Sequence, residues 1–483
     1  MIDVRPVLFI NGLVFLVLAA AMGVPAVVDF VLQDLDWQVF LASGMVTGFA
    51  GFVLMFGNRP RGKLNLTTRQ AFLFTTSAWV GAAAAGALPF VFSNLEMSLA
   101  DSYFEAMSGL TTTGSTVIVG LDSKPYGILL WRAILHWLGG IGIIVMAVAL
   151  LPMLRIGGMQ LFRMESSDKT EKVKPRVSQI ASAILVVYLV LTVVCAIALW
   201  LAGMSAFEAV CHAMATLSTG GFSTSDGSIG HFESPTIEWI VTVFMAIGGT
   251  TFVLFITPWK HNRWALLYDS QVGWYVTFVL FFSAAVALWY WAVSDVSAHQ
   301  AVRHATFSVI SVVTTTGFAA ADYSTWGGFA QVTFFILTFI GGCTGSTSGG
   351  IKVFRFQVLF AMAGVHLKRL LHPHGVFVID FNKQNISDVV VRSVSSFVVL
   401  YFVCFAALAL ALTMVGLDVV TALTGAATAI SNVGPGLGPI IGPAGNFEPL
   451  PDSAKWLLSF GMLLGRLELL TVIVLFLPSF WRS

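Results

Sequence analysis

A run of ten weak helix formers interrupts one of the apolar segments of this chain. Residues 341–350 read GGCTGSTSGG, between the stretches TFFILTFI and IKVFRFQVLF. Glycine, serine and threonine favour a helix less than alanine or leucine do. Non-helical backbone persists at the depth of a membrane only where it lines water or is buried in protein. The run therefore indicates a pore with a flexible plug, expected to consist of Gly341, Gly342, Cys343, Thr344, Gly345, Ser346, Thr347, Ser348, Gly349 and Gly350.

The rest of the chain has the composition of a helical membrane protein. Hydrophobic residues make up 57% of the 483 residues, and charged residues only 10%. Apolar stretches of about 20 residues, the length that spans hydrocarbon, recur throughout the sequence, and it lacks the short alternating segments of a transmembrane barrel. We therefore expect an all-α polytopic membrane protein. The apolar residues 7–31 are expected to be a retained span, because the run is too long for a signal peptide and only Arg5 precedes it as a positive charge.

A unit of span, short helix, threonine/glycine loop and span occurs four times, after two N-terminal spans. The loops read GLTTTGST, TLSTGGFS, VTTTGFAA and ISNVGPGLG, and they align on Gly114, Gly221, Gly317 and Gly434. A second landmark follows each loop, within the next expected span, at Gly139-Gly140, Gly248-Gly249, Gly341-Gly342 and Leu464-Gly465. Four copies of one unit predict a pseudo-fourfold axis. The expected division is 1–69 for the two N-terminal transmembrane helices and 70–178, 179–270, 271–390 and 391–483 for the four pore repeats, the third with the plug.

Positive and negative residues lie at opposite ends of these units. By the positive-inside rule the cations face the cytoplasm, so both termini are expected inside and the four loops enter from outside. The acids would form a negative vestibule that concentrates cations, although ordinary solvated loop acids explain some of them individually. The cations are Arg155, Arg163, Lys169, Lys172, Lys174, Arg176, Lys260, Arg263, Lys352, Arg355, Lys368 and Arg369. The acids are Glu96, Asp101, Glu105, Asp122, Glu208, Asp226, Glu233, Glu238, Asp295, Asp322, Asp418, Glu448 and Asp452.

The four loops have the chemistry of a filter for a dehydrated monovalent cation. Such an ion needs several weak, neutral oxygens at once, which rings of backbone carbonyls supply. Glycine lets successive carbonyls point one way at no steric cost, and the short helix before each loop would aim its partly negative C-terminus at the axis. Close helix packing through small residues is the alternative. The expected filter residues are Thr112, Thr113, Gly114, Thr219, Gly220, Gly221, Thr315, Thr316, Gly317, Asn432, Val433 and Gly434.

The loops, the run at 341–350, the motif GRLEL at 465–469 and the N-terminal pair of spans together resemble the membrane subunit of Trk-type potassium uptake systems. That subunit belongs to a superfamily that also holds the Ktr and HKT transporters, and the likeness covers the chain from about Asn11 to its end. The resemblance implies potassium-selective translocation through a bacterial inner membrane into the cytoplasm, with no cofactor besides the transported ion. It also implies a homodimer bound to a cytoplasmic, nucleotide-binding regulatory subunit.

By the same resemblance, the four aligned glycines are the filter glycines, the run at 341–350 is the gating loop, and Arg466 is the pore arginine. The presence of all four glycines resembles the potassium-selective members, since sodium-passing relatives place serine at the first position. The fourth loop departs most from the family pattern, because it continues as a long Pro/Gly segment to Pro443. It is expected to coordinate the ion less symmetrically.

Arg466 also stands out by its charge alone. It lies between the apolar runs LLSFGMLLG and LELLTVIVLFL, and an ionisable residue inside a membrane is a functional candidate by default. It aligns with Ile141, Thr250 and Cys343, just below the expected filter. Glu468 would project from a different face of a helix and would be a poor local partner. A structural ion pair with an acid on another helix is the alternative.

Other functions fit the sequence less well. A secondary transporter for another cation or small solute would also have glycine-rich broken helices, but that fold shows two related halves. No nucleophile–base set, Walker loop or dinucleotide motif supports an enzyme or a nucleotide-binding protein, and no nucleic-acid partner is expected. The basic segments Arg155–Arg176 and His366–His374 are expected to contact a protein partner or anionic lipid headgroups. Channel-like conduction and coupling to a proton or sodium gradient both stay open.

Overall fold

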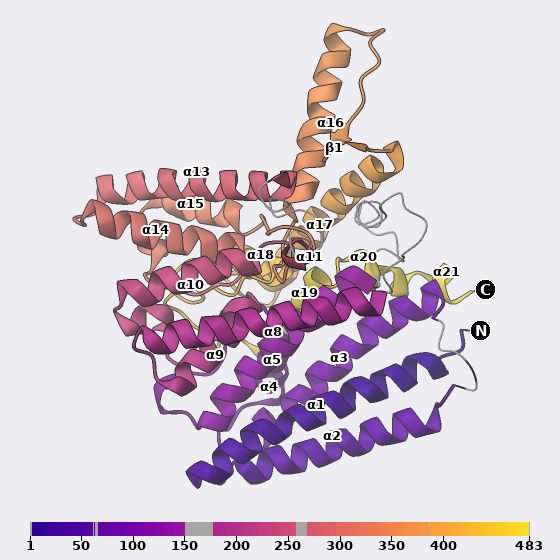
Figure 1. The fold of residues 1–483 in the computed structure, drawn as a ribbon, viewed down its shortest axis with the longest axis vertical. Coiled ribbons are helices and arrows are strands. Elements are labelled where there is room, and N and C mark those ends of the chain that lie inside the picture. Colours follow the sequence, from indigo (N-terminus) through magenta and orange to yellow (C-terminus); the bar gives the residue numbers. More distant parts are fainter. Residues whose placement is uncertain are drawn as a thin grey trace.

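The computed structural model describes residues 2–60, 62, 66–149, 177–256, 268–382 and 384–482. These residues form a helical assembly whose only strands are one two-stranded hairpin (Figure 1). Seven of the described helices are long and apolar enough to span a membrane, and one bent pair of helices adds up to an eighth span. The expected all-α polytopic architecture is confirmed. The basic segment Arg155–Arg176 lies outside the described residues.

Two long antiparallel helices, α1 (Arg5–Leu32) and α2 (Trp37–Gly57), form one edge of the molecule. They cross closely at Gly12 and Gly51, where a Cβ on either residue would lie within 3.0 Å of the carbonyl oxygen of the other. Small residues permit this kind of approach between membrane helices. The Asp29 carboxylate then joins the pair to the rest of the protein by accepting a 2.7 Å hydrogen bond from the Gly127 N–H.

The order of elements then repeats four times. The first unit contains α3 (Thr68–Phe92), α4 (Leu99–Leu110), η1 (Leu121–Ser123) and α5 (Tyr126–Ala149). The second contains α8 (Val177–Leu201), α9 (Ala206–Leu217), η2 (Ser228–Phe232), α10 (Pro235–Gly248) and α11 (Val253–Ile256). The third contains α13 (Ser270–Val293), α14 (Ala298–Val313), η4 (Tyr323–Thr325), α15 (Gly328–Leu337), α16 (Val353–Leu371), β1 (Asp380–Phe381) and β2 (Gln384–Asn385). The fourth contains α17 (Asp388–Met414), α18 (Val419–Ser431), α19 (Asp452–Arg466), α20 (Leu470–Ile473), η5 (Val474–Phe476) and α21 (Pro478–Trp481).

The short helices α4, α9, α14 and α18 begin and end in the same way. A polar side chain caps each N-terminus by accepting a hydrogen bond from the N–H of the third helical residue, and these caps are Ser98, Ser205, Ser297 and Asp418. Just beyond each C-terminus, one N–H bonds to the carbonyl five residues earlier at 2.8 to 3.1 Å, and these donors are Thr113, Gly220, Thr316 and Val433. The four helices therefore deliver their loops in one geometry.

The second helix passes its landmark unbroken in the fourth unit, where α19 contains Leu464 and Gly465, and also in the first unit. There α5 runs through Gly139 and Gly140, whereas α10 ends at Gly248 and α15 ends at Leu337. The expectation that the landmarks lie inside spans is therefore wrong for the second and third units. The physical reason is that the chain leaves the helix to bond elsewhere, as where the Cys343 N–H donates to the Gly249 carbonyl at 2.8 Å.

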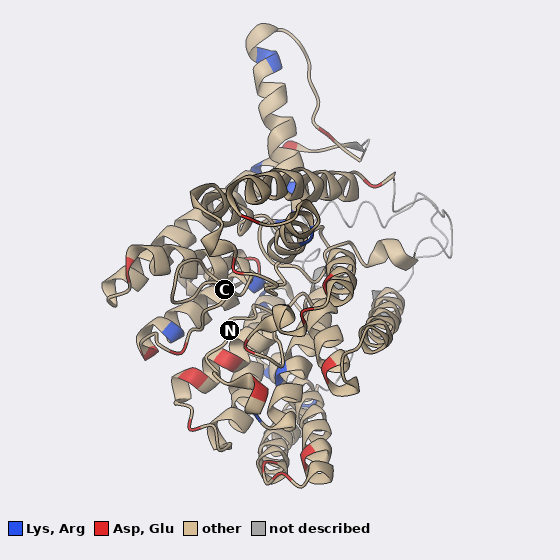
Figure 2. Ribbon diagram, turned by 90° about the vertical axis from the view of Figure 1, so that its left-hand side faces the viewer, with Lys and Arg blue, Asp and Glu red and all other residues tan. Residues whose placement is uncertain are grey.

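Charge and chain ends define two faces of the molecule. Both termini lie together at one end of the long helices (Figure 1). Figure 2 views the opposite end, where acidic residues gather at the helix ends and loops. At this acidic end a hydrogen bond from the Ser225 hydroxyl holds the pKa of Asp122 below its ordinary value, so this carboxylate stays ionised at neutral pH. The helix α16 instead crosses the direction of the other helices and projects from the body.

Candidate functional site

The four threonine/glycine loops meet at the centre with one alternating backbone conformation. The aligned glycine of each loop has a positive φ, with values of 86°, 82°, 81° and 108° for Gly114, Gly221, Gly317 and Gly434. The residue two positions earlier is also left-handed, with φ of 49°, 52°, 59° and 56° for Thr112, Thr219, Thr315 and Asn432. This alternation between left- and right-handed residues lets consecutive carbonyls face the same way, as the sequence analysis required.

The loops close into a ring in chain order. A Cβ on Gly114 would lie within 3.0 Å of the Gly220 carbonyl oxygen in the second loop. Gly221 stands in the same relation to Thr316 of the third loop, and Gly317 to Val433 of the fourth. The circle closes where Gly434 faces the Thr113 carbonyl of the first loop. Each loop thus presents its carbonyl edge to its neighbour, and no side chain fits between them.

Hydroxyl and amide groups support the loops from behind. The first hydroxyl after each of three short helices donates back to the carbonyl four residues earlier at 2.7 to 2.8 Å, and these residues are Thr111, Ser218 and Thr314. In the fourth loop the Asn432 amide donates to Thr113 Oγ1 at 3.0 Å and to the Met462 carbonyl at 2.9 Å. These polar side chains brace the ring, which leaves its inner surface to backbone carbonyls.

The run at 341–350 lies directly against this ring. The Gly349 N–H donates to Thr315 Oγ1 at 2.6 Å, which joins the run to the third loop. Thr347 Oγ1 donates to the carbonyls of Leu217 and Gly248 in the second unit, at 3.1 and 3.0 Å. A Cβ on Gly349 would also lie within 3.0 Å of the Ser431 carbonyl oxygen in the fourth unit. The run therefore contacts three of the four units, its own included.

The base of the run is closed by backbone pairing. Ile340 and Ile351 form a parallel bridge, and the Gly341 N–H donates to the Ile351 carbonyl at 2.9 Å. Most residues of the run are buried, with Gly345 and Gly350 partly exposed. The run is thus an ordered loop pinned at its base, and Lys352, the residue after Ile351, donates through Nζ to the Ser348 carbonyl.

Arg466 lies at a sharp bend of the fourth unit, next to this run. The chain turns by 107° between α19 and the segment Leu470–Phe476, and Glu468 and Leu469 between them have φ of 59° and 45°. The expectation of a helix continuing through the GRLEL motif is therefore wrong. Arg466 is 2% exposed, and its Nη1 donates to the Thr347 carbonyl at 2.9 Å.

The partners of Arg466 decide how its charge is felt. Within the described part of the chain no carboxylate pairs with Arg466, and its Nε and Nη2 have no hydrogen-bond partner. Glu468 instead pairs with Arg355 across 2.5 Å, and the Arg355 guanidinium lies 3.6 Å from the centre of the Phe397 ring. The described residues thus lend no support to a structural ion pair at Arg466.

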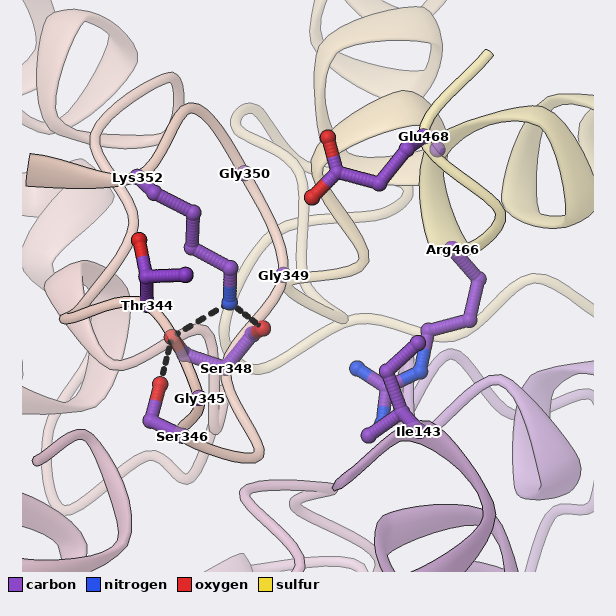
Figure 3. Close-up of a pocket in the computed structure, with 11 residues that line it drawn as sticks. Ile143, Thr344, Gly345, Ser346, Ser348, Gly349, Gly350, Lys352, Arg466 and Glu468 are labelled. Atoms are coloured by element: carbon purple, nitrogen blue, oxygen red, sulfur yellow. Dashed lines mark hydrogen bonds between the residues drawn. The ribbon is translucent and has the colours of Figure 1, made fainter. Parts of the chain in front are cut away.

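A small cavity of about 20 Å³ separates the run from the bend. That space suffices for about one water molecule. Figure 3 shows Lys352 and Arg466 on opposite sides of it, with Glu468 above. Two basic side chains and one carboxylate therefore line this cavity.

Two buried side chains near the ring, Arg132 and His136 of α5, were not predicted from the sequence, and both contact the second loop. Glu105 of α4 was expected in the acidic vestibule, but it is fully buried and pairs with Arg132 at 2.7 Å. The only sequence signal for them is their spacing, because Arg132 and His136 are two ionisable residues one helical turn apart in an otherwise apolar span. Within the described residues, no group of three or more His, Cys, Asp or Glu could hold a metal ion.

Comparison with known proteins agrees with this geometry. Residues 36–483 match the family TrkH, described as "Cation transport protein". The chain belongs to the TrkH family. The Trk system potassium uptake protein TrkI of Halomonas elongata is 47% identical over 480 residues, which cover 99% of this chain and 97% of the relative. TrkH of Escherichia coli is 39% identical over 491 residues, covering 99% of each chain.

The fold agrees over its full length with a solved member of the TrkH family. The crystal structure of the potassium transporter TrkH from Vibrio parahaemolyticus superposes with a TM-score of 0.92, at 36% identity, and covers 100% of both chains. Membership of this family makes the chain a multi-pass membrane transport protein and not an enzyme, as the sequence analysis expected. The Trk resemblance is thereby confirmed.

Proposed function

We propose that the chain conducts potassium ions into a bacterial cytoplasm, with the twelve loop residues named above as its filter. The observation that carries the proposal is the closed ring, in which each left-handed glycine faces a carbonyl of the next loop. Such a ring offers neutral oxygens from four sides, which suits a dehydrated monovalent cation. The similarity to proteins named for potassium uptake supports potassium as that ion.

In this proposal the run at 341–350 is the gate and Arg466 is an electrostatic barrier beside it. The run contacts three units beneath the ring, which supports a role in blocking the pathway. A fixed positive charge about 6 Å from a potassium ion repels it by about 3 kcal/mol at an effective dielectric constant near 20. That repulsion alone slows passage roughly a hundredfold. Opening must therefore move both the run and the guanidinium.

The proposal extends to placement and partners. The exposed cations Lys368 and Arg369 and both chain ends are assigned to the cytoplasmic side of the inner membrane, because cytoplasmic loops carry the excess of Lys and Arg. In the same proposal, the N-terminal pair of helices ends at residue 69, and the first three pore repeats end at residues 178, 270 and 390. A second copy of the chain would cover the projecting C-terminal part of α16, where Leu367, Leu370 and Leu371 are exposed. A cytoplasmic nucleotide-binding regulatory subunit would contact basic residues such as Lys368 and Arg369 and move the gate through α16.

Ion flux into liposomes that contain the purified chain tests the proposal. Uptake of potassium and rubidium should exceed uptake of sodium and lithium, and it should proceed down the potassium gradient alone. Deleting Gly345–Gly349 should raise rubidium uptake at least tenfold without any regulator, and the preference for potassium should survive because the ring is unchanged. Equal uptake of all four ions would contradict the filter. Uptake that requires a proton or sodium gradient would favour a secondary transporter.

A further inference from the structure

The second loop differs from the first and third at the position before its filter glycine. The first and third loops place Thr113 and Thr316 there, whereas the second loop has Gly220. The backbone of Gly220 is not left-handed, so its conformation does not demand glycine. The available space does: a Cβ on Gly220 would lie within 3.0 Å of three atoms of the His136 imidazole.

His136 reaches the second loop from α5, which belongs to the first unit. Its side chain is fully buried, and its Nδ1 accepts a hydrogen bond of 3.4 Å from the Phe222 N–H. The imidazole also stacks on the Phe222 ring, with 4.0 Å between centroids and 15° between planes. Gly220 is therefore held between the imidazole behind it and Gly114 of the first loop, which its carbonyl oxygen faces.

Arg132, one turn earlier on α5, holds the following residues of the same loop. Its Nη1 donates to the Ser223 carbonyl at 2.7 Å, and its guanidinium lies 4.1 Å from the centre of the Phe222 ring. Its Nε donates to Glu105 at 2.7 Å, and the other Glu105 oxygen accepts the Val117 N–H of the first loop at 2.9 Å. Arg132 therefore ties the outer parts of the first and second loops together.

The other units lack this pair of side chains. When the second helices are aligned on their landmarks, the positions of Arg132 and His136 are occupied by Val241 and Met245, Phe334 and Thr338, and Leu457 and Gly461. We propose that Arg132 and His136 are positioning residues that set the ion specificity of the second filter loop. The inference rests on the proposed potassium conduction. Without the imidazole, the Gly220 peptide has room to move. Its carbonyl oxygen could then approach either a potassium or a sodium ion, and the ring would discriminate less between the two.

A double-variant series tests the contact between Gly220 and His136. In liposomes, His136→Ala should lower the potassium-to-sodium permeability ratio at least fivefold while rubidium uptake persists. His136→Asn keeps an acceptor for the Phe222 N–H and should retain more of the ratio. Arg132→Lys keeps the positive charge beside Glu105 but loses the guanidinium group that donates to the Ser223 carbonyl. The permeability ratio should therefore fall in this variant as well. Gly220→Ala should lower the melting temperature, and His136→Ala in the same chain should relieve most of that loss.

Two matched variants separate this role from general packing. Gly221→Ala meets the Thr316 carbonyl and not the imidazole, so His136→Ala should not relieve its effect. Met245→Ala removes a buried side chain at the position of the second unit that corresponds to His136, and it should leave the ratio unchanged. A wild-type ratio in His136→Ala, or equal melting losses for Gly220→Ala with and without His136, would overturn the inference. A wild-type protein without potassium or rubidium flux would instead refute the proposed function, and the melting temperatures would still test the contact.

Discussion

Position 114 shows how one residue meets two demands. Its φ of 86° lies in the left-handed region, and a side chain there would run into the Gly220 carbonyl oxygen. Glycine alone satisfies both conditions. We expect Gly114→Ser to displace the carbonyls of the first and second loops and to lower the potassium-to-sodium permeability ratio at least tenfold. Competing uptake of the two ions into liposomes, per folded protein, measures the effect.

Gly120→Ser is the matched control for this change. Gly120 lies four residues beyond the first loop with φ of 72°, but its nearest neighbour, Ser123 Oγ, would be 3.6 Å from an added Cβ. The control therefore imposes similar backbone strain without intruding on the ring, and the ratio should stay at the wild-type value. A wild-type ratio in Gly114→Ser would remove the first loop from the filter.

The sequence predicted the ring residues far better than the residues behind them. The four ring glycines could be predicted to lie together because four copies of one local pattern align, and a local pattern is visible in a sequence. His136 and Arg132 act on residues 86 and 91 positions away, and no nearby pattern marks such contacts. The doubled glycine at 220–221 was visible, but its cause is the imidazole from another unit, which only the folded chain reveals.

At the scale of elements, the short helices were easier to predict than the breaks. An N-terminal cap and an apolar face specify each short helix locally. The bend after Arg466 depends on a distant partner, because Glu468 turns toward Arg355 of α16. A break in a helix was therefore not predicted where contacts between residues far apart in the sequence determine it.

Thr347 joins the proposed gate to two other units. Its Oγ1 is shared between the Leu217 and Gly248 carbonyls, and its own carbonyl accepts from Arg466. Thr347→Val keeps the side-chain shape and removes the hydroxyl, which costs the closed state about 1 kcal/mol. We expect resting rubidium uptake without the regulator to rise about fivefold, with an unchanged potassium preference.

A threonine that lies away from the gate provides the comparison. Thr413 of α17 also donates through its hydroxyl to a carbonyl, that of Leu410 at 2.8 Å, but it is exposed. Thr413→Val should leave resting uptake unchanged. If Thr347→Val also shows wild-type uptake, the Thr347 hydroxyl does not stabilise the closed run, and this result would contradict its proposed role in the gate.

At the scale of the whole molecule, the separation of charges makes orientation testable. A membrane-impermeant maleimide should label Asp295→Cys in intact cells, and it should label Arg482→Cys only after the membrane is opened. Both positions are exposed. The natural background is low because Cys195, Cys211 and Cys343 are buried and Cys404 is half-buried. Labelling of Arg482→Cys in intact cells would invert the proposed orientation.

The projecting helix α16 gives the proposed dimer a physical test. Leu370 and Leu371 are 66% and 77% exposed in the single chain, and α16 lies apart from the helical body (Figure 1). If a second copy covers them, two leucines per chain contribute about 1.5 kcal/mol each, so Leu370→Ser with Leu371→Ser should weaken the dimer at least a hundredfold. Light scattering of the purified protein in detergent should then report a monomer.

Leu280 and Phe281 of α13 are each 64% exposed, and their paired change to serine should leave the dimer intact if α16 carries the contact. A dimer that survives the α16 changes would place the contact elsewhere.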